Sequence, residues 1–163
     1  MEKEIYFAGG CFWGVQEYFS RLKGVIQTSV GYANGTSANP SYHDLKQGLA
    51  DHAETAYIRY DDNVISLEKL LEHYLRFVDP YSVNRQGHDE GLQYRSGIYY
   101  LDEKDKEIVL HYFNEHLEKN YAIQVEKLRN YYLAEEYHQD YLKKNLDGYC
   151  HVNLNLIKEN EKK

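Results

Sequence analysis

The sequence has few of the features that mark a secreted scaffold, a multidomain chain or a membrane protein. It contains two cysteines and two prolines among 163 residues, and no Gly/Ser tract that would form a linker. No apolar run approaches the ~20 residues needed to cross a bilayer. Residues 1–4 lack the basic and apolar regions of a signal peptide. We therefore expect one cytosolic catalytic domain over residues 1–163, with a C-terminal tail from about residue 147.

Positive charge is also scarce. The formal net charge is −7, and lysines and arginines cluster only at the extreme C-terminus. A general nucleic-acid binder needs a basic face, so this class is excluded. A composition that is 42% hydrophobic and 28% charged is ordinary for a globular protein. We expect a monomer that binds neither nucleic acid nor membrane.

The two cysteines, Cys11 and Cys150, are too few for a disulfide framework. They are inert thiols, a metal-binding pair or a redox pair. A structural zinc site uses ligands at short spacing, such as Cys-x-x-Cys. These cysteines lie at opposite ends of the chain, with no closely spaced histidine pair beside either. The sequence therefore predicts no metal, and its Gly9-Gly10 turn is not a nucleotide-binding signature, so no bound cofactor is expected.

Hydrophobic periodicity predicts interspersed strands and helices. Strands are expected at 4–8, 25–30, 54–60, 94–101 and 123–125, with loops at 39–49 and 79–91. Helices are expected from residue 11, from 67 to before Pro80, from 103 to about 120, and over 135–145. This order predicts an α+β fold: a two-layer sandwich of a mixed sheet covered by helices, with an irregular C-terminal tail.

Cys11 follows a predicted strand and two glycines, at the expected start of a helix. The first helical N–H groups lack intrahelical partners, and the helix dipole is positive there. We therefore expect the pKa of this thiol to lie below its free value of ~8.5. The aromatic rings of Phe12 and Trp13 belong either to the core or to an apolar pocket. Position alone leaves a catalytic and a buried structural cysteine equally open.

Glu54 begins a strand in which Glu54, Ala56 and Ile58 share one face. A carboxyl group on an apolar face has a raised pKa and can act as a general acid. The alternative is a carboxylate at a strand end that points into water. His52 lies two residues away, so a Cys–His site is a further alternative, although a histidine at a strand edge is more often structural.

The segment Gly10-Cys11-Phe12-Trp13-Gly14 resembles the signature of the A-type peptide methionine sulfoxide reductases. Further segments match the family in its own order over roughly residues 5 to 151: Gly31-Tyr32-Ala33-Asn34-Gly35, Asn39-Pro40-Ser41-Tyr42, His52-Ala53-Glu54, Asn84-Arg85-Gln86-Gly87, Asp89, Gln93-Tyr94-Arg95-Ser96, Tyr137-His138-Gln139 and Gly148-Tyr149-Cys150. Such an ordered series is more specific than one short motif. The chain departs at Gly48-Leu49-Ala50-Asp51, where the family usually has Gly-x-Thr-Gly, and its tail has no further cysteine.

This resemblance implies a role for each matching residue. It implies Cys11 as nucleophile, Glu54 as acid and Cys150 as the resolving thiol. The remaining implied positions are Phe12 and Trp13 around the substrate methyl group, Tyr42 and Tyr94 at the sulfoxide oxygen, and Asp89 as a water-binding acid.

The implied activity is reduction of methionine S-sulfoxide, free or in a peptide, which repairs oxidised proteins. Cys11 would become a sulfenic acid, condense with Cys150 to a disulfide, and be recycled by thioredoxin. Two alternatives use the same cysteines. A thiol peroxidase needs no methyl pocket, and a non-enzymatic redox sensor would be oxidised without turnover.

Overall fold

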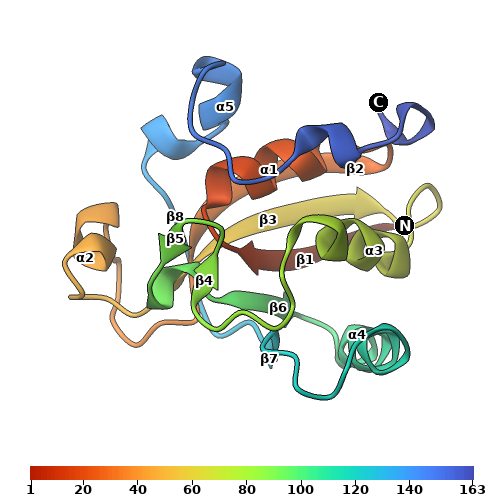
Figure 1. The fold of residues 1–163 in the computed structure, drawn as a ribbon, viewed down its shortest axis with the longest axis horizontal. Coiled ribbons are helices and arrows are strands. Elements are labelled where there is room, and N and C mark those ends of the chain that lie inside the picture. Colours follow the sequence, from red (N-terminus) through yellow and green to blue (C-terminus); the bar gives the residue numbers. More distant parts are fainter.

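A six-stranded sheet forms the centre of the computed structural model, which describes residues 1–163 (Figure 1). Its spatial order is β7-β6-β1-β3-β2-β8. Neighbouring strands are antiparallel except β6 and β7, so the sheet is mixed, as predicted. The strands are β1 (Glu2–Gly9), β2 (Val25–Ala33), β3 (Ala53–Asp61), β6 (Ser96–Tyr100), β7 (Gln124–Lys127) and β8 (Tyr131–Leu133), and a separate hairpin joins β4 (Arg85–Gln86) to β5 (Asp89–Glu90).

Helices cover one face of this sheet. Those that do are α1 (Phe12–Ser20), α3 (Leu67–Phe77) and α4 (Glu103–His116), whereas α2 (Tyr42–Lys46) lies at one end of the sheet and α5 (Tyr141–Lys144) packs against α1 (Figure 1). Val15 of α1, Leu70 of α3 and Phe113 of α4 share one buried cluster with Phe7 and Ile58 of the sheet. The apolar faces of these three helices thus pack against the side chains of alternate strand residues. The predicted α+β two-layer arrangement is confirmed.

The turn between β1 and α1 brings three distant segments together. Gly10 has φ +89°, a conformation that favours glycine. A Cβ atom there would lie 2.8 Å from Gln86 Cβ and 2.9 Å from His151 Nε2. The loop that carries β4 and the C-terminal tail therefore both pack directly on the residue that precedes Cys11.

Several predicted segments differ in the structure: the expected loop at 79–91 contains the hairpin of β4 and β5, and β8 was not predicted. The expected loop at 39–49 contains α2, because Ser41 and Asp44 form a capping box. The expected helix at 135–145 is wrong: a 3₁₀ turn over Glu136–His138 and the short α5 flank Asp140, which has φ +50°. The side chain of Gln139 bonds both the N–H and the carbonyl of Val30, at 2.9 and 2.8 Å, which holds this segment at the sheet edge instead.

The C-terminal tail is mostly irregular, as predicted, and runs back along α1 (Figure 1). Its end is fixed by the Glu161 carboxylate, which accepts hydrogen bonds of 2.7 and 2.8 Å from both terminal nitrogens of Arg76. A bidentate pair of this kind is geometrically specific. The tail is therefore anchored at both ends of its path over the helix, at His151 and at Glu161.

None of the helices is long and apolar enough to span a membrane.

Candidate active site

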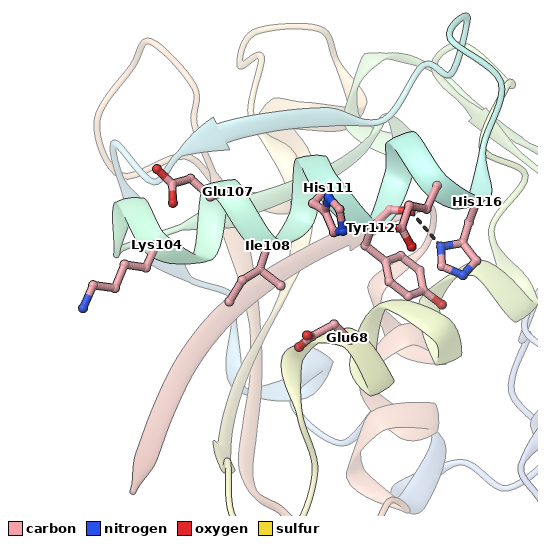
Figure 2. A pocket seen from close by; sticks show the side chains of 8 residues that line it. Glu68, Lys104, Glu107, Ile108, His111, Tyr112 and His116 are labelled. Atoms are coloured by element: carbon pink, nitrogen blue, oxygen red, sulfur yellow. Dashed lines mark hydrogen bonds and ion pairs between the residues drawn. The ribbon is translucent and has the colours of Figure 1, made fainter.

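The largest surface cavity lies away from every predicted site residue. It measures about 570 Å³ and lies between α3 and α4, where Glu68, Lys104, His111 and Tyr112 are among its lining residues (Figure 2). It contains no cysteine, and most of its lining is charged or polar. The candidate site instead lies at the start of α1, on the opposite side of the helix layer from α4 (Figure 1).

Cys11 is the residue immediately before the first turn of α1, as the sequence predicted, and it is 8% exposed. The expected lowering of its pKa is wrong. Burial raises the pKa of the Cys11 thiol, and the negative charge of Glu54 raises it further. The backbone N–H of Trp13 at the helix start acts in the opposite direction, but its effect is smaller.

Glu54 lies on β3 beside this helix start and is 1% exposed. Its Oε1 accepts a hydrogen bond of 3.3 Å from the N–H of Phe12, and its Oε2 accepts one of 2.8 Å from the Gln93 side chain. Burial raises the pKa of Glu54 to about 7, while these two hydrogen bonds and Lys46 lower it. The face predicted for Glu54 is confirmed, since Ala56 and Ile58 lie in the core.

The hydroxyl groups of Tyr42 and Tyr94 approach the carboxyl group from α2 and from the 3₁₀ turn Leu92–Tyr94. Burial raises both pKa values, and so does the charge of Glu54. Lys46 lies between them: its Nζ is 3.2 Å from Tyr94 Oη, and 5.4 and 5.8 Å from the centres of the two rings. Both phenols therefore stay protonated at neutral pH and remain hydrogen-bond donors.

Phe12 and Trp13 contribute to an aromatic wall next to Cys11. Phe12 is 1% exposed and packs against Tyr32 and His138, with ring centres 5.7 and 5.2 Å apart. The Trp13 indole stacks on Tyr141 at 3.7 Å and donates a hydrogen bond of 3.0 Å to His138 Nδ1. The two rings are thus held rigidly from both sides, which suits a wall for a small apolar group.

Asp89 and Cys150 also lie near Cys11, since the negative charge of each would raise the pKa of its thiol. The Asp89 carboxylate accepts a 3.0 Å hydrogen bond from the hydroxyl of Tyr149, the residue before Cys150. A Cβ atom at Gly14 would lie 2.9 Å from Cys150 Sγ. Positions 11 and 14 are neighbours on a helix surface. The tail therefore places the second sulfur within one helical turn of Cys11, and both thiols are free.

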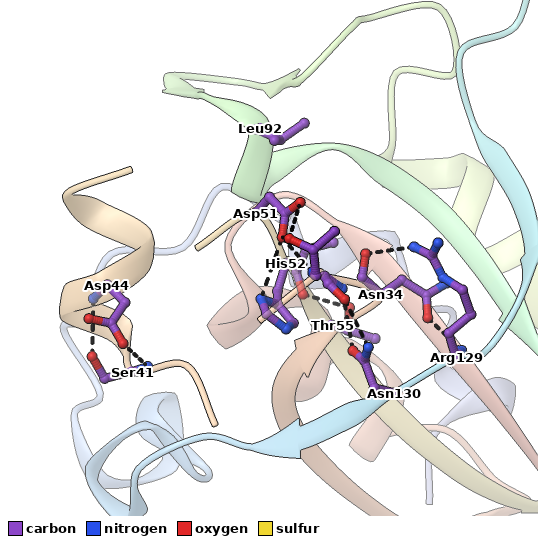
Figure 3. Close-up of polar contacts among 12 residues, drawn as sticks. Asn34, Ser41, Asp44, Asp51, His52, Thr55, Leu92, Arg129 and Asn130 are labelled. Carbon is purple, nitrogen blue, oxygen red and sulfur yellow. Dashed lines mark hydrogen bonds and ion pairs between the residues drawn. The ribbon is translucent and has the colours of Figure 1, made fainter. Parts of the chain in front are cut away.

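The loop that departs from the family pattern still holds Glu54 in place. Asp51 accepts hydrogen bonds of 2.7 Å from the Thr36 N–H and of 3.1 and 3.0 Å from its hydroxyl, and its carbonyl accepts one of 2.8 Å from Arg95 (Figure 3). His52 is fully buried, and a Cβ atom at Gly35 would lie 2.1 Å from its Nδ1. The tight contact with the Gly35 backbone indicates packing for His52 rather than a Cys–His pair.

Three residues near the site were not singled out from the sequence. Gln93 and His138 lie inside segments that resemble the family. The sequence therefore included them among the matching residues but did not predict what they contact. Lys46 lies four residues after Tyr42, and a helix places such residues on one face. Recognising the capping box at Ser41 would have predicted α2 and would have brought Lys46 to the site.

The chain is similar to known proteins over nearly its whole length. A family model described as peptide methionine sulfoxide reductase matches residues 3–163. The chain belongs to the peptide methionine sulfoxide reductase family. An MsrA of Clostridium botulinum is 53% identical over 156 residues, which are 93% of this chain and 99% of the relative. An MsrA of Ureaplasma urealyticum is 49% identical over 162 residues, 98% of each chain.

Solved structures of sulfoxide reductases share the fold. Reduced Mxr1 of Saccharomyces cerevisiae has a TM-score of 0.84 and 34% identity, covering 93% of this chain and 91% of its own. Methionine sulfoxide reductase A of Corynebacterium diphtheriae has a TM-score of 0.81 and 34% identity, covering 91% and 77%. The chain is therefore an enzyme of thiol-dependent methionine sulfoxide reduction, and this assignment decides against the thiol peroxidase and the redox sensor.

Proposed function

We propose that the enzyme reduces the S epimer of methionine sulfoxide, free or in a peptide, with Cys11 as nucleophile and Glu54 as acid. One observation carries the assignment of roles: the buried Glu54 carboxyl bonds the N–H of Phe12, the residue next to Cys11. A nucleophile and an acid with a pKa near neutrality can thus act on one small molecule.

The proton balance of the first step follows from these two groups. The Cys11 sulfur attacks the sulfoxide sulfur while protonated Glu54 gives its proton to the sulfoxide oxygen, and the thiol proton returns to the carboxylate. Oxygen then passes to Cys11, which becomes a sulfenic acid, and methionine leaves. The thiol is oxidised by two electrons and the sulfoxide is reduced by two.

The surrounding side chains fit the other roles. Tyr42 and Tyr94 donate hydrogen bonds to the oxygen as it gains negative charge. Phe12 and Trp13 form the wall that receives the methyl group. Asp89 binds a water molecule.

Recycling is the second step. The Cys150 thiol attacks the Cys11 sulfenic sulfur, a disulfide forms and water leaves. An external dithiol then reduces the disulfide, and we propose thioredoxin, with no bound cofactor. The support is a relative: yeast Mxr1 has been solved in complex with Trx2, and that structure aligns with a TM-score of 0.58 and 25% identity. Such recycling fits a single catalytic domain in the reducing cytosol.

Separated R and S methionine sulfoxide, with quantification of methionine, test the proposal. The wild-type protein with dithiothreitol should convert the S epimer only. Cys11→Ser should form no methionine, whereas Cys150→Ser should form one methionine per enzyme and then stall with thioredoxin. Turnover by Cys11→Ser would remove Cys11 from the reaction, and sustained thioredoxin turnover by Cys150→Ser would discard the resolving role.

A further inference from the structure

The ammonium group of Lys46 has an unusual environment for an exposed lysine. It forms no salt bridge with a carboxylate; it donates a hydrogen bond to the hydroxyl of Tyr94, and it also lowers the pKa of the neighbouring Tyr42 hydroxyl. It also lies over the ring faces of Tyr42 and Tyr94. Cation–π attraction to two rings holds the side chain on this side of α2. A positive charge is thereby kept beside the two phenols proposed to bind the substrate oxygen.

The direction of this hydrogen bond has a chemical consequence. An ammonium group donates and cannot accept, so Tyr94 Oη is the acceptor. The hydroxyl hydrogen of Tyr94 must point away from Lys46, and no protein acceptor binds it. Donation by a cation also polarises the phenol and strengthens the hydrogen bond that the phenol itself donates.

We propose that Lys46 is a positioning residue, which acts through Tyr94 by aiming and polarising its hydroxyl toward the sulfoxide oxygen. The inference rests on the proposed role of Tyr94. Charge that develops on the oxygen in the transition state then meets a preorganised donor supported by a cation. Because the charge is larger in the transition state than in the bound sulfoxide, loss of Lys46 lowers kcat more than it raises KM.

Lys46 also acts on the acid of the reaction. The titratable and hydrogen-bonding groups that act on Glu54 are Cys11 and the Phe12 N–H at the start of α1, Tyr32 of β2, Tyr42 and Lys46 of α2, Asp89 of β5, and Gln93 and Tyr94 of the 3₁₀ turn. Lys46 is the cation among them, and it lowers the Glu54 pKa, whereas Asp89 raises it. Removing Lys46 therefore raises the Glu54 pKa and shifts the alkaline limb of the pH–rate profile to higher pH. A purely structural role of Lys46 would not move that limb.

Single-turnover rates of Lys46→Met, Lys46→Arg, Tyr94→Phe and the double variant Lys46→Met/Tyr94→Phe test this inference. Lys46→Met should lower the rate about tenfold, the effect of one good hydrogen bond, and raise the alkaline limb by up to about one pH unit. Lys46→Arg should recover most of the rate. Lys119→Met is the charge-matched control, since Lys119 is exposed on the connection after α4.

The double variant decides how Lys46 acts. If Lys46 works through Tyr94, its loss should add little to the rate defect of Tyr94→Phe when rates are compared at a pH below the alkaline limb, where Glu54 is protonated in every variant. Independent, multiplying defects would overturn the inference, as would an unmoved pH profile in Lys46→Met. A wild-type rate in Tyr94→Phe would also overturn it, while leaving the Cys11 and Glu54 steps intact, because Cys11→Ser tests those separately.

Discussion

Replacing Glu54 with glutamine should make the protein less active but more stable at alkaline pH. Glutamine has nearly the same shape, and its oxygen can still accept the Phe12 N–H. The Gln93 amide can turn so that its oxygen accepts from the new NH₂ group. Only the charge and the transferable proton are lost. The rate of the first turnover should fall by about 10² or more, the usual contribution of a general acid.

The stability gain follows from the raised pKa. In the unfolded chain this carboxyl has its ordinary pKa of 4.5, and in the folded protein its pKa is about 7. A raised pKa means that the native state binds the proton more tightly, so its contribution is fully present below pH 4.5 and is lost as pH rises through 7. The shift corresponds to about 3 kcal/mol, the cost of burying the charge at alkaline pH.

Urea unfolding of the wild type and of Glu54→Gln at about pH 5 and about pH 8 measures this difference. The free energy of unfolding of the variant, relative to the wild type, should increase by about 2–3 kcal/mol between the two pH values. Glu118→Gln, at an exposed glutamate, is the charge-matched control. A difference between variant and wild type that is the same at both pH values would show that Glu54 is not held neutral by burial.

Two further predictions concern neighbours of the site, and a third concerns the anchor of the C-terminal tail. Gly14→Ala places a methyl group 2.9 Å from Cys150 Sγ, so it should slow disulfide formation more than the first methionine release, measured by thiol titration against methionine yield. Gln93→Met removes a hydrogen bond that lowers the Glu54 pKa, so the alkaline limb of the pH–rate profile should move upward. Glu161→Gln weakens the pair with Arg76 and should cost about 2 kcal/mol at neutral pH by urea unfolding. Because that pair depresses the Glu161 pKa far below 4.5, the loss should be full above pH 4.5, shrink as pH falls below it, and disappear only as pH falls through the depressed folded-state pKa.

Local periodicity in the sequence was enough to predict much of the fold. Alternation along residues 54–60 put Glu54 on the same face as Ala56 and Ile58, and the helix expected from residue 67 is α3, which begins at Leu67. The expected helix at 135–145 failed because a tertiary contact overrode the local pattern. Gln139 binds the backbone of Val30, far away in the sequence, and no local signal reports that partner.

The residues of the candidate site were likewise predicted only in part. The ordered motifs located Cys11, Glu54, Tyr94 and Cys150, since each lies in a segment similar to the family. They did not predict the contact between the Cys150 sulfur and Gly14, because the tail is irregular and its path depends on long-range anchors. They also missed Lys46, which no motif contains.

The pKa of Cys11 shows most clearly where local reasoning fails. A helix start stabilises an anion by roughly 1 kcal/mol when exposed, whereas burial and a neighbouring carboxylate penalise a thiolate more strongly. The free enzyme therefore cannot keep Cys11 and Glu54 both ionised. The ionisation of each group instead depends on the other: a Cys11 thiolate is favoured only while the Glu54 carboxyl is neutral. The carboxyl in turn loses its proton only when an acceptor oxygen is bound beside it. In the proposed reaction the bound sulfoxide supplies that acceptor: Glu54 gives its proton to the oxygen and takes the thiol proton in return, so the thiol need not be ionised beforehand.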